Sequence, residues 1–239
     1  SYRSFRPSSG TGAQSGLGSS AIVPANRFTP LQLRILRLLG RIAPPPTLTG
    51  GAPLTGYYIG HRQTRDLDLF WRHRDSLGDL GREAERLLRA DGLDVAVLVA
   101  GGGFQKLRVF DGEESMVVDL VVEPGAPLAE PELLDLGGFS FPADSPHELL
   151  VSKVCTLLDR TELRDLRDVR ALLALGLDLD RALADAPMKN GGFSPAIVAW
   201  NLETHFDIGA MAKAEDSVSA AEARELDDFR IWLIRKLMS

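Results

Sequence analysis

Two aspartates, Asp66 and Asp68, stand one residue apart in the segment 66–70, where carboxylates could hold a metal ion. We expect a strand at 67–71. Residues two apart on a strand project to the same face, so both carboxylates would point together. Carboxylate oxygens suit Mg²⁺, and a pair at this spacing can bind one or two ions. Most Asp-x-Asp pairs are surface residues at a strand end, so the pair alone does not establish a metal site.

A third aspartate, Asp119, interrupts the apolar run 116–122. A charged group in such a run is costly unless it is paired or bound to a metal. The alternatives are a buried aspartate paired with an arginine, or a strand edge that faces water. If its strand neighbours the strand of Asp66 and Asp68, the three carboxylates form one acidic cluster. Bound Mg²⁺ would relieve the mutual repulsion of that cluster.

A glycine pair, Gly50-Gly51, separates a predicted short strand at 47–49 from a predicted short helix at 52–59. Without a Cβ, the backbone can approach a triphosphate, and the following N–H groups point at its oxygens. Glycine pairs are also common in turns. The glycine run at 101–103 has no helix after it and is interpreted as a hairpin loop. The glycine pair and the aspartates together indicate phosphoryl or nucleotidyl transfer.

The second half of the chain adds charged residues that could act on a phosphate: Lys153, Arg160, Arg164, Asp165 and Asp168. On an unbroken helix over 147–170, all of them except Asp165 would fall within roughly a quarter turn. A lysine there would neutralise charge that develops during transfer. An aspartate could orient that lysine or act as a base on an incoming hydroxyl. The alternative is an exposed, ion-paired helix face, because Arg164 and Asp168 are four residues apart.

The elements that must position these groups predict an α+β fold. Thr29 and Pro30 are typical of a helix start, and Gly40 ends that helix. Asp111-Gly112 predicts a hairpin, and Ser145-Pro146 opens a helical second half. The remaining predicted elements are strands at 67–71, 93–99, 104–110 and 115–122, and helices at 80–90, 163–175, 178–185, 194–205 and 218–238. We therefore expect a mostly antiparallel or mixed sheet with flanking helices, followed by an all-helical half.

This division predicts three regions. Residues 1–27 are rich in Ser, Gly and Pro and are expected to be a flexible tail or an arm laid on a partner. Residues 28–144 would form the core with the sheet, and residues 145–239 a helical C-terminal domain. The chain of 239 residues is long enough for one large domain or two small ones.

The composition is that of a folded soluble protein, with 44% hydrophobic and 25% charged residues. A single cysteine, Cys155, rules out an internal disulfide and fits a reducing compartment. The sequence has neither an apolar run of about 20 residues nor a signal pattern, so we expect a cytoplasmic protein with no membrane partner. The net charge of −6 argues against a dedicated nucleic-acid coat protein. A local basic patch is still present around the aspartate pair, at His61, Arg62, Arg65, Arg72, His73 and Arg74.

In this order, the segments resemble the AbiEii toxin family of nucleotidyltransferases, the toxin half of type IV toxin–antitoxin pairs. The family pattern opens with a glycine pair, a short apolar helix, a basic residue, a small hydroxyl residue and Asp-x-Asp. A lysine on a helix, an arginine about two turns later and a basic-Asp-x-x-Asp-apolar run follow. Here these are Gly50-Gly51, 52–59, His61-Arg62, Thr64, Asp66-Leu67-Asp68, Lys153, Arg160 and 164–169. Asp119 would be the third strand aspartate. Pro53 departs from the family's helix residue, and Gly-Gly replaces the Gly-Ser of other polymerase-β-like enzymes.

The resemblance implies a polymerase-β-like core that uses Mg²⁺ and an NTP, with the tRNA 3′ end as acceptor for some members and a cognate antitoxin as partner. Asp66, Asp68 and Asp119 would hold the metal. Asp119 would also help to deprotonate the acceptor hydroxyl, and Asp168 or Asp165 would orient Lys153 or act as base. The residues expected to bind the nucleotide are Gly50, Gly51, Arg62, Thr64, Lys153, Arg160 and Asp165.

Two other functions stay open on the sequence. The same core serves small-molecule nucleotidyltransferases, which modify an antibiotic or a metabolite. An acidic pocket in the helical half would favour a cationic drug, whereas a basic groove would favour RNA. The other alternative is a binding module that kept the scaffold but lost catalysis, against which the three carboxylates and Lys153 count.

Overall fold

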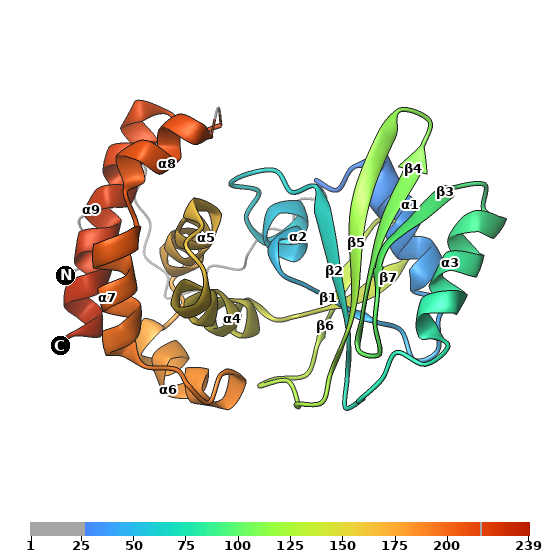
Figure 1. Cartoon of the computed structure of the whole chain (residues 1–239), viewed down its shortest axis with the longest axis horizontal. Helices are drawn as coiled ribbons and strands as arrows, with labels where there is room; N and C mark the ends of the chain where they lie inside the picture. Colours follow the sequence, from blue (N-terminus) through green and yellow to red (C-terminus); the bar gives the residue numbers. More distant parts are fainter. Residues whose placement is uncertain (1–26, 216) are drawn as a thin grey trace, which may run out of the picture.

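The computed structural model describes residues 27–215 and 217–239, so nearly all of the predicted N-terminal arm lies outside the described residues (Figure 1). Within them, one mixed sheet has the strand order β3-β4-β5-β2-β1-β7-β6. Strands β2 and β5 are parallel, as are β1 and β7, and the other neighbours are antiparallel. The strands are β1 (Thr47–Thr49), β2 (Asp66–Arg72), β3 (Asp94–Ala100), β4 (Phe104–Asp111), β5 (Glu114–Glu123), β6 (Glu132–Asp135) and β7 (Ser140–Ala143).

Helices cover the two faces of the sheet differently (Figure 1). Helices α1 and α3 pack together on one face, and the short α2 and the whole helical half lie on the other. The helices are α1 (Pro30–Leu39), α2 (Gly51–Pro53), the π-helix η2 (Leu54–Tyr58), α3 (Leu80–Ala90), α4 (Pro146–Asp159), α5 (Leu163–Ala174), α6 (Leu179–Lys189), α7 (Pro195–His205), α8 (Ile208–Ala214) and α9 (Ala220–Leu237). The predicted α+β class with a mixed sheet is confirmed.

Strand β2 shows how the sequence pattern sets the faces. Leu67 and Leu69 are fully buried, while Asp66, Asp68 and Phe70 between and beyond them are partly exposed. Alternate residues of a strand point to opposite faces, so the leucines enter the core and the aspartates face the helical half. The predicted common direction of the two carboxylates is therefore confirmed.

Helix starts follow their predicted caps. The Thr29 side chain accepts a hydrogen bond from the Gln32 N–H while the Gln32 side chain accepts one from the Thr29 N–H, a capping box. Ser145 caps α4 with a single bond, which its side chain accepts from the Glu148 N–H. The predicted helix at 52–59 differs: it starts at Gly51 and passes after Pro53 into the π-helix η2. A π-helix carries one more residue per turn, a local change that propensity does not reveal.

Three elements were not predicted: β6, β7 and α8, which have four, four and seven residues. Strands this short show too little alternation to be recognised. Buried apolar side chains from both halves of the chain form one hydrophobic cluster. The predicted boundary between 144 and 145 falls between β7 and α4 and stays a prediction. Among the described residues, no helix has the length and apolar character needed to cross a membrane.

Candidate active site

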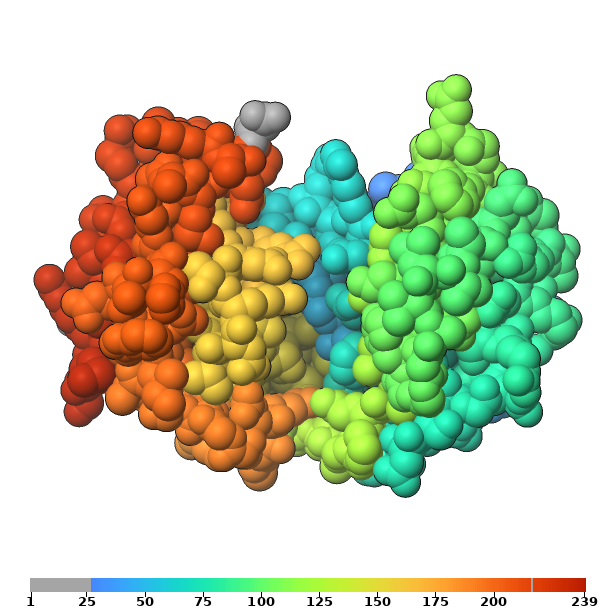
Figure 2. Space-filling view, viewed as in Figure 1, coloured from blue at the N-terminus to red at the C-terminus, as the bar shows by residue number. Residues whose placement is uncertain are grey.

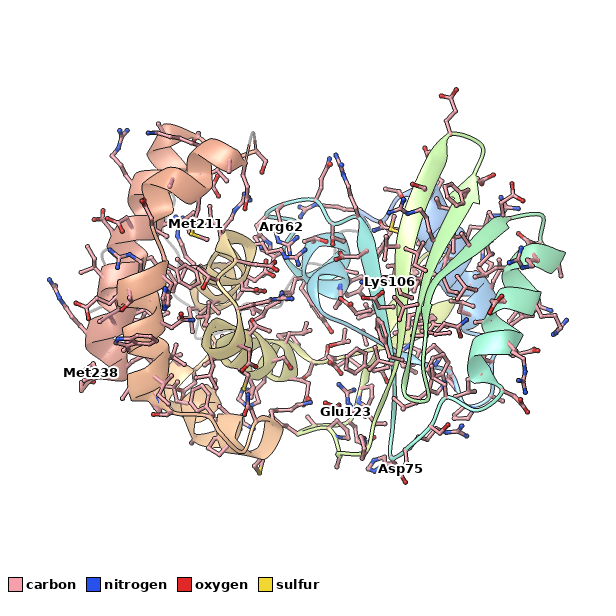
Figure 3. All side chains as sticks on the ribbon, viewed as in Figure 1. Arg62, Asp75, Lys106, Glu123, Met211 and Met238 are labelled. Atoms are coloured by element: carbon pink, nitrogen blue, oxygen red, sulfur yellow. The ribbon has the colours of Figure 1, made fainter. Side chains whose placement is uncertain are left out.

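A cavity of about 450 Å³ lies between the sheet and the helical half, and Figure 2 shows the hollow between the two. The sheet side of the cavity carries Asp66, Asp68 and Asp119, and the helical side carries Lys153 and Arg160. In Figure 3, Lys106 lies on the sheet side, and Glu123 lies toward the lower end of the strands. The cavity therefore brings together residues from segments that are far apart in the sequence.

Asp68 and Asp119 are paired in register on the parallel strands β2 and β5. Neighbouring strands are about 4.8 Å apart, so two side chains at one register position on one face are close neighbours. Burial raises the pKa of Asp68 to about 6, and the charges of Asp66 and Asp119 add to the rise. The three predicted carboxylates thus interact electrostatically in one place.

Asp119 is held by Lys106, whose Nζ lies 3.2 Å from Asp119 Oδ2. The other carboxylate oxygen, Oδ1, is buried without a hydrogen-bond partner. Burial raises the pKa of Asp119 even though Lys106 lowers it. Neither alternative for Asp119 applies. Its partner is a lysine that lines the same cavity and not an arginine, and β5 lies between β4 and β2 and is not an edge strand.

Lys106 was missed by the sequence analysis, although a signal for it existed. Gly112 has a φ of +62° in the turn of the β4–β5 hairpin, as the Asp111-Gly112 pattern predicts. Counting back along both strands from that turn pairs Lys106 with Asp119. Residues directly opposite each other in an antiparallel pair share a face.

Asp66 has 35% of its side chain accessible, against 18% for Asp119. Its Oδ1 accepts a short hydrogen bond from the Thr64 hydroxyl, and Arg164 Nη1 lies 3.7 Å from its Oδ2. Thr64 therefore contacts Asp66 directly, and Arg164 of α5 lies beside the same carboxylate.

The three carboxylates are the kind of ligand that a divalent metal prefers, although they do not enclose an ion by themselves. Among the described residues, no group of three His, Cys, Asp or Glu side chains lies close enough to enclose an ion. Three carboxylates nevertheless line one cavity, and one of them has a buried oxygen without a partner. Hard divalent cations prefer oxygen ligands, and a positive charge there would offset the repulsion that raises the Asp68 pKa. The residues present fit Mg²⁺.

The glycine pair lies against the same carboxylates. Gly50 has a φ of +69°, a conformation that favours glycine, and a Cβ on it would overlap Asp68 Oδ2. A Cβ on Gly51 would lie 2.6 Å from Arg62 Nη2. The backbone there approaches two predicted site residues more closely than any residue with a side chain would allow. Because Gly50 and Gly51 also line the cavity, a phosphate could approach the same backbone.

The helical side of the cavity is built on two buried aspartates. Asp168 accepts two hydrogen bonds from Arg62, at 2.7 and 2.8 Å, and lies 2.7 Å from both His61 Nε2 and Lys153 Nζ. Burial alone would raise the pKa of Asp168, but Arg62, His61 and Lys153 hold it well below its usual range. Asp168 therefore ties the loop after η2 to helices α4 and α5.

Asp165 has a similar environment. It lies 2.9 Å from Lys153 Nζ and 2.7 Å from Arg160 Nε. Burial works to raise its pKa, yet Arg160 and Lys153 lower it on balance. Lys153 is therefore held between two carboxylates at one wall of the cavity.

The charged residues between 153 and 168 do not share one unbroken helix, so the predicted basis of this cluster was wrong. The helix over 147–170 is broken: α4 ends at Asp159, and Arg160 is extended with a φ of −147° and a ψ of 156°. The Arg160 side chain donates a hydrogen bond to Asp165 on the next helix, α5. The alternative of an exposed Arg164–Asp168 face is also wrong, because Asp168 is fully buried while Arg164 pairs with Glu162 and Asp66.

Three residues of the predicted basic patch, His61, Arg62 and Arg72, pair with carboxylates in two separate places, while Arg65 and His73 are exposed. His61 and Arg62 bind Asp168, as described above. Arg72 lies at the far end of β2, where it makes two hydrogen bonds to Asp144 at 2.7 and 2.9 Å and one to Glu123. That part of the patch is a nearly buried ion-pair network and not a solvated surface.

A second, larger groove of about 1,410 Å³ meets the cavity at the carboxylates. Both are lined by Arg62, Asp66, Lys106, Asp119 and Arg164. The basic residues that line the groove are Arg27, His61, Arg62, Arg65, Lys106, Arg164 and Arg167, and the acidic ones are Asp66, Glu114, Asp119 and Glu215. The groove is thus richer in cations than the protein as a whole, whose net charge is −6.

Comparisons with known proteins identify the family of the chain. A family model described as the nucleotidyl transferase AbiEii toxin of type IV toxin–antitoxin systems matches residues 37–230. Among curated proteins, none matches the chain in sequence.

Several solved structures share the fold. MenT4, a nucleotidyltransferase toxin from Mycobacterium tuberculosis H37Rv, superposes with a TM-score of 0.57 at 18% identity, over 86% of this chain and 82% of its own. A putative nucleotidyltransferase from H. pylori gives 0.52 at 16% identity, over 87% and 93%. JHP933 from Helicobacter pylori gives 0.51 at 17% identity, over 87% and 90%. At such identities the likeness concerns the fold.

Proposed function

The chain belongs to the AbiEii family of nucleotidyltransferase toxins, and on that basis we propose that it transfers a nucleotide from an NTP to the 3′ end of a tRNA in a magnesium-dependent reaction. One observation carries the proposal. Asp66 and Asp119 line both the cavity, with its glycines and cations, and the larger basic groove, and Asp119 is paired in register with Asp68 of the cavity. A donor nucleotide and a large acceptor could therefore reach the same carboxylates from two sides.

The donor would occupy the cavity. Gly50, Gly51 and Thr64 would contact its phosphates, and Arg62, Lys153 and Arg160 would balance their charge. Gly50, Gly51, Arg62, Lys153 and Arg160 line the cavity, and Thr64 binds the carboxylate of Asp66. Because the cations are already held by Asp165 and Asp168, they would need little rearrangement when a triphosphate binds.

Asp66, Asp68 and Asp119 would hold Mg²⁺. When bound, the ion would stabilise negative charge on the attacked phosphate and on the leaving oxygen. Asp119 would also take the proton from the acceptor hydroxyl, for which its unpartnered buried oxygen is available. That hydroxyl oxygen would form a bond to the α-phosphorus, and the bond from this phosphorus to the bridging oxygen would break to release pyrophosphate.

Between the two roles considered for Asp168, the contacts favour orientation over base catalysis. All four of its close contacts come from donors, and its pKa is lowered. A carboxylate held in this way is a poor proton acceptor. We assign Asp168, and Asp165 with it, to positioning Lys153 and Arg62.

The charge of the larger groove favours RNA over a cationic small molecule as acceptor. Single-stranded nucleic acid ends bind in positively charged grooves that follow the backbone. The lining of this groove has more basic than acidic residues. A cognate antitoxin as partner and a cytoplasmic location follow from the family and belong to the same proposal. A catalytically inactive module is disfavoured by the three carboxylates and Lys153, all of which line the cavity.

The experiment is a transfer assay with each of four α-³²P-labelled NTPs, total RNA and Mg²⁺. We expect label in RNA of tRNA size with the parent protein and a loss of roughly 1,000-fold or more in Asp68→Ala, because one preorganised electrostatic group supplies about that much. Asp75→Ala is the matched control, since Asp75 is exposed and lines neither cavity nor groove. Equal activity in Asp68→Ala, with folding unchanged by circular dichroism, would reject the assignment.

A further inference from the structure

The two edges of the sheet are protected to different degrees. Strand β6, at one edge, has four residues, two of which are acidic, and Pro131 precedes it. Strand β3, at the other edge, has seven residues, and the chain from Val95 to Gly103 contains neither a charged residue nor a proline. Charges and prolines on an exposed edge normally prevent it from pairing with a strand of another chain. The β3 edge lacks both.

The backbone of β3 offers hydrogen-bonding groups at this edge. The Gly103 carbonyl accepts a bond from β5, so every second residue after it on β4 also turns its backbone groups toward β5. Val109 is one of these residues, and it lies opposite Val95. Val95, and Val97 two residues later, therefore turn their N–H and C=O groups away from β4. Arg89 donates to the Val95 carbonyl at 2.6 Å, but a carbonyl oxygen has two lone pairs and can accept a second bond.

The side chains in the second half of β3 are apolar on both faces. Val97, Leu98 and Val99 keep 43%, 45% and 47% of their surface exposed. The register against β4 shifts between Val97 and Val99, so Leu98 is the extra residue of a bulge and the two valines lie on opposite faces. No residue of β3 lines the cavity or the groove, and β3 lies at the end of the molecule opposite the helical half (Figure 1). This edge is therefore separate from the candidate active site.

We propose that β3 is the contact surface of a homodimer, in which it pairs antiparallel with β3 of a second copy about a twofold axis at Val95. In this register the two Val95 residues exchange hydrogen bonds, and Val97 stands opposite Leu93 of the other copy. Residues opposite each other in an antiparallel pair share a face. A twofold contact uses the same edge of both copies, so the assembly closes at two chains.

Charge complementarity selects a second copy as the occupant of this edge. Asp94 and Arg108 are exposed and lie on one face of the sheet, because Asp94 is paired with Phe110, two residues from Arg108. Within the described part of the chain, neither has an ion-pair partner. With the axis at Val95, Asp94 of one copy lies opposite Ala96 of the other, and Ala96 is paired with Arg108. The small alanine side chain leaves room for Arg108 to reach that aspartate, so a dimer gains two ion pairs.

The contact is small, so we expect a weak dimer. Residues 93–97 of each copy pair, and the exposed apolar side chains beside them lose surface, which is far less than the roughly 1,600 Å² of a standard interface. The net charge of −6 on each copy also opposes association, although salt at about 0.15 M screens it. We expect a dissociation constant on the order of 10 µM, measured by sedimentation velocity of the full chain at about 1 to 200 µM.

Two charge reversals test the second copy and the register together. Asp94→Arg brings two arginines together at each ion pair, and Arg108→Asp brings two aspartates together. Each change acts twice in a twofold dimer, so we expect either variant alone to raise the dissociation constant roughly 10- to 30-fold. An equimolar mixture of the two variants has opposite charges at both positions, so it should dimerise within about threefold of the parent. Arg224→Asp, at an exposed position of α9 at the other end of the molecule, is the control and should dimerise like the parent.

Val97→Pro tests the backbone contact. The Val97 N–H faces away from β4, so proline should leave the sheet intact and abolish dimerisation up to about 200 µM. Circular dichroism checks that each variant is folded.

A parent protein that stays monomeric up to about 200 µM would overturn the proposal and leave this edge to a strand of a different protein. A dimer whose dissociation constant neither reversal changes would overturn it as well, and so would a mixture that associates no better than the single variants. None of these measurements uses nucleotide transfer, so the homodimer and the proposed function succeed or fail independently.

Discussion

The two walls of the cavity hold their aspartates in opposite electrostatic states. On the sheet side, burial and mutual repulsion raise the pKa of Asp68, and one oxygen of Asp119 has no partner. On the helical side, Asp165 and Asp168 are fully buried, yet Lys153, Arg160, Arg62 and His61 lower their pKa values. The carboxylates on the sheet side lack enough positive charge nearby to offset their repulsion. Those on the helical side are fully paired with cations.

This contrast separates binding from scaffolding. Aspartates that repel each other cost stability in the free protein, and such sites are usual where a ligand brings the missing charge. Aspartates that are paired and hydrogen-bonded stabilise the fold and fix their partners. The same residue type should therefore give opposite responses to substitution on the two walls.

The largest expected effect on stability is on the helical wall. Asp168→Asn would leave Arg62 and Lys153 buried without their counter-charge, so we expect the free energy of unfolding at pH 7.5 to fall by about 3–5 kcal/mol. A folded-state pKa below the unfolded one adds stability at neutral pH, and this stability is lost as the pH falls below about 4. The difference between variant and parent in urea denaturation should therefore shrink at acid pH. A destabilisation below 1 kcal/mol would show that Asp168 does not tie the loop after η2 to helices α4 and α5.

The next effect has the opposite sign. Asp68→Asn, with EDTA present, should raise the free energy of unfolding at pH 7.5 by roughly 1–3 kcal/mol, because it removes an ionised buried carboxylate. The folded-state pKa of about 6 lies above the unfolded value, so the penalty in the parent is full above pH 6 and absent below about pH 4. The gain in urea midpoint should vanish over that range. A loss of stability at pH 7.5 would show that Asp68 is paired after all.

The smallest effect concerns Lys106. Lys106→Met removes the group that lowers the pKa of Asp119, so that pKa should rise further. Partly exposed pairs are worth up to about 1 kcal/mol, so we expect the acid limb of the pH–rate profile for transfer to move upward by about half a pH unit. Lys213→Met, at an exposed site away from both the cavity and the groove, is the control. An unmoved acid limb would mean that Asp119 does not govern it.

The sequence predicted those parts of the fold that depend on local chemistry. The cap at Thr29, the alternation in β2 and the turn at Gly112 each carry a physical signal within a few residues, and each was confirmed. The break between α4 and α5 has no glycine or proline at Arg160 to announce it. That residue is extended where its side chain pairs with Asp165, a tertiary contact that no local pattern contains.

The positions of the site residues could be predicted only where the geometry of a single strand determines them. The spacing of Asp66 and Asp68 determines their common face, but the adjacency of Asp119 requires β2 and β5 to be parallel neighbours, which only the complete fold decides. The full burial of Asp168 could not be predicted, because its helix also carries the partly exposed Arg164 only four residues earlier. The roles assigned to these residues in catalysis stay predictions.

The left-handed turn at Gly50 makes this position intolerant of every replacement. Any other residue would strain the backbone, and its first side-chain atom would collide with Asp68. In a genetic screen for cells that survive production of this toxin, disabling changes at codon 50 would therefore be expected beside changes in the aspartates. Such a screen would recover inactive variants in which Asp68 is displaced although all aspartate codons are intact.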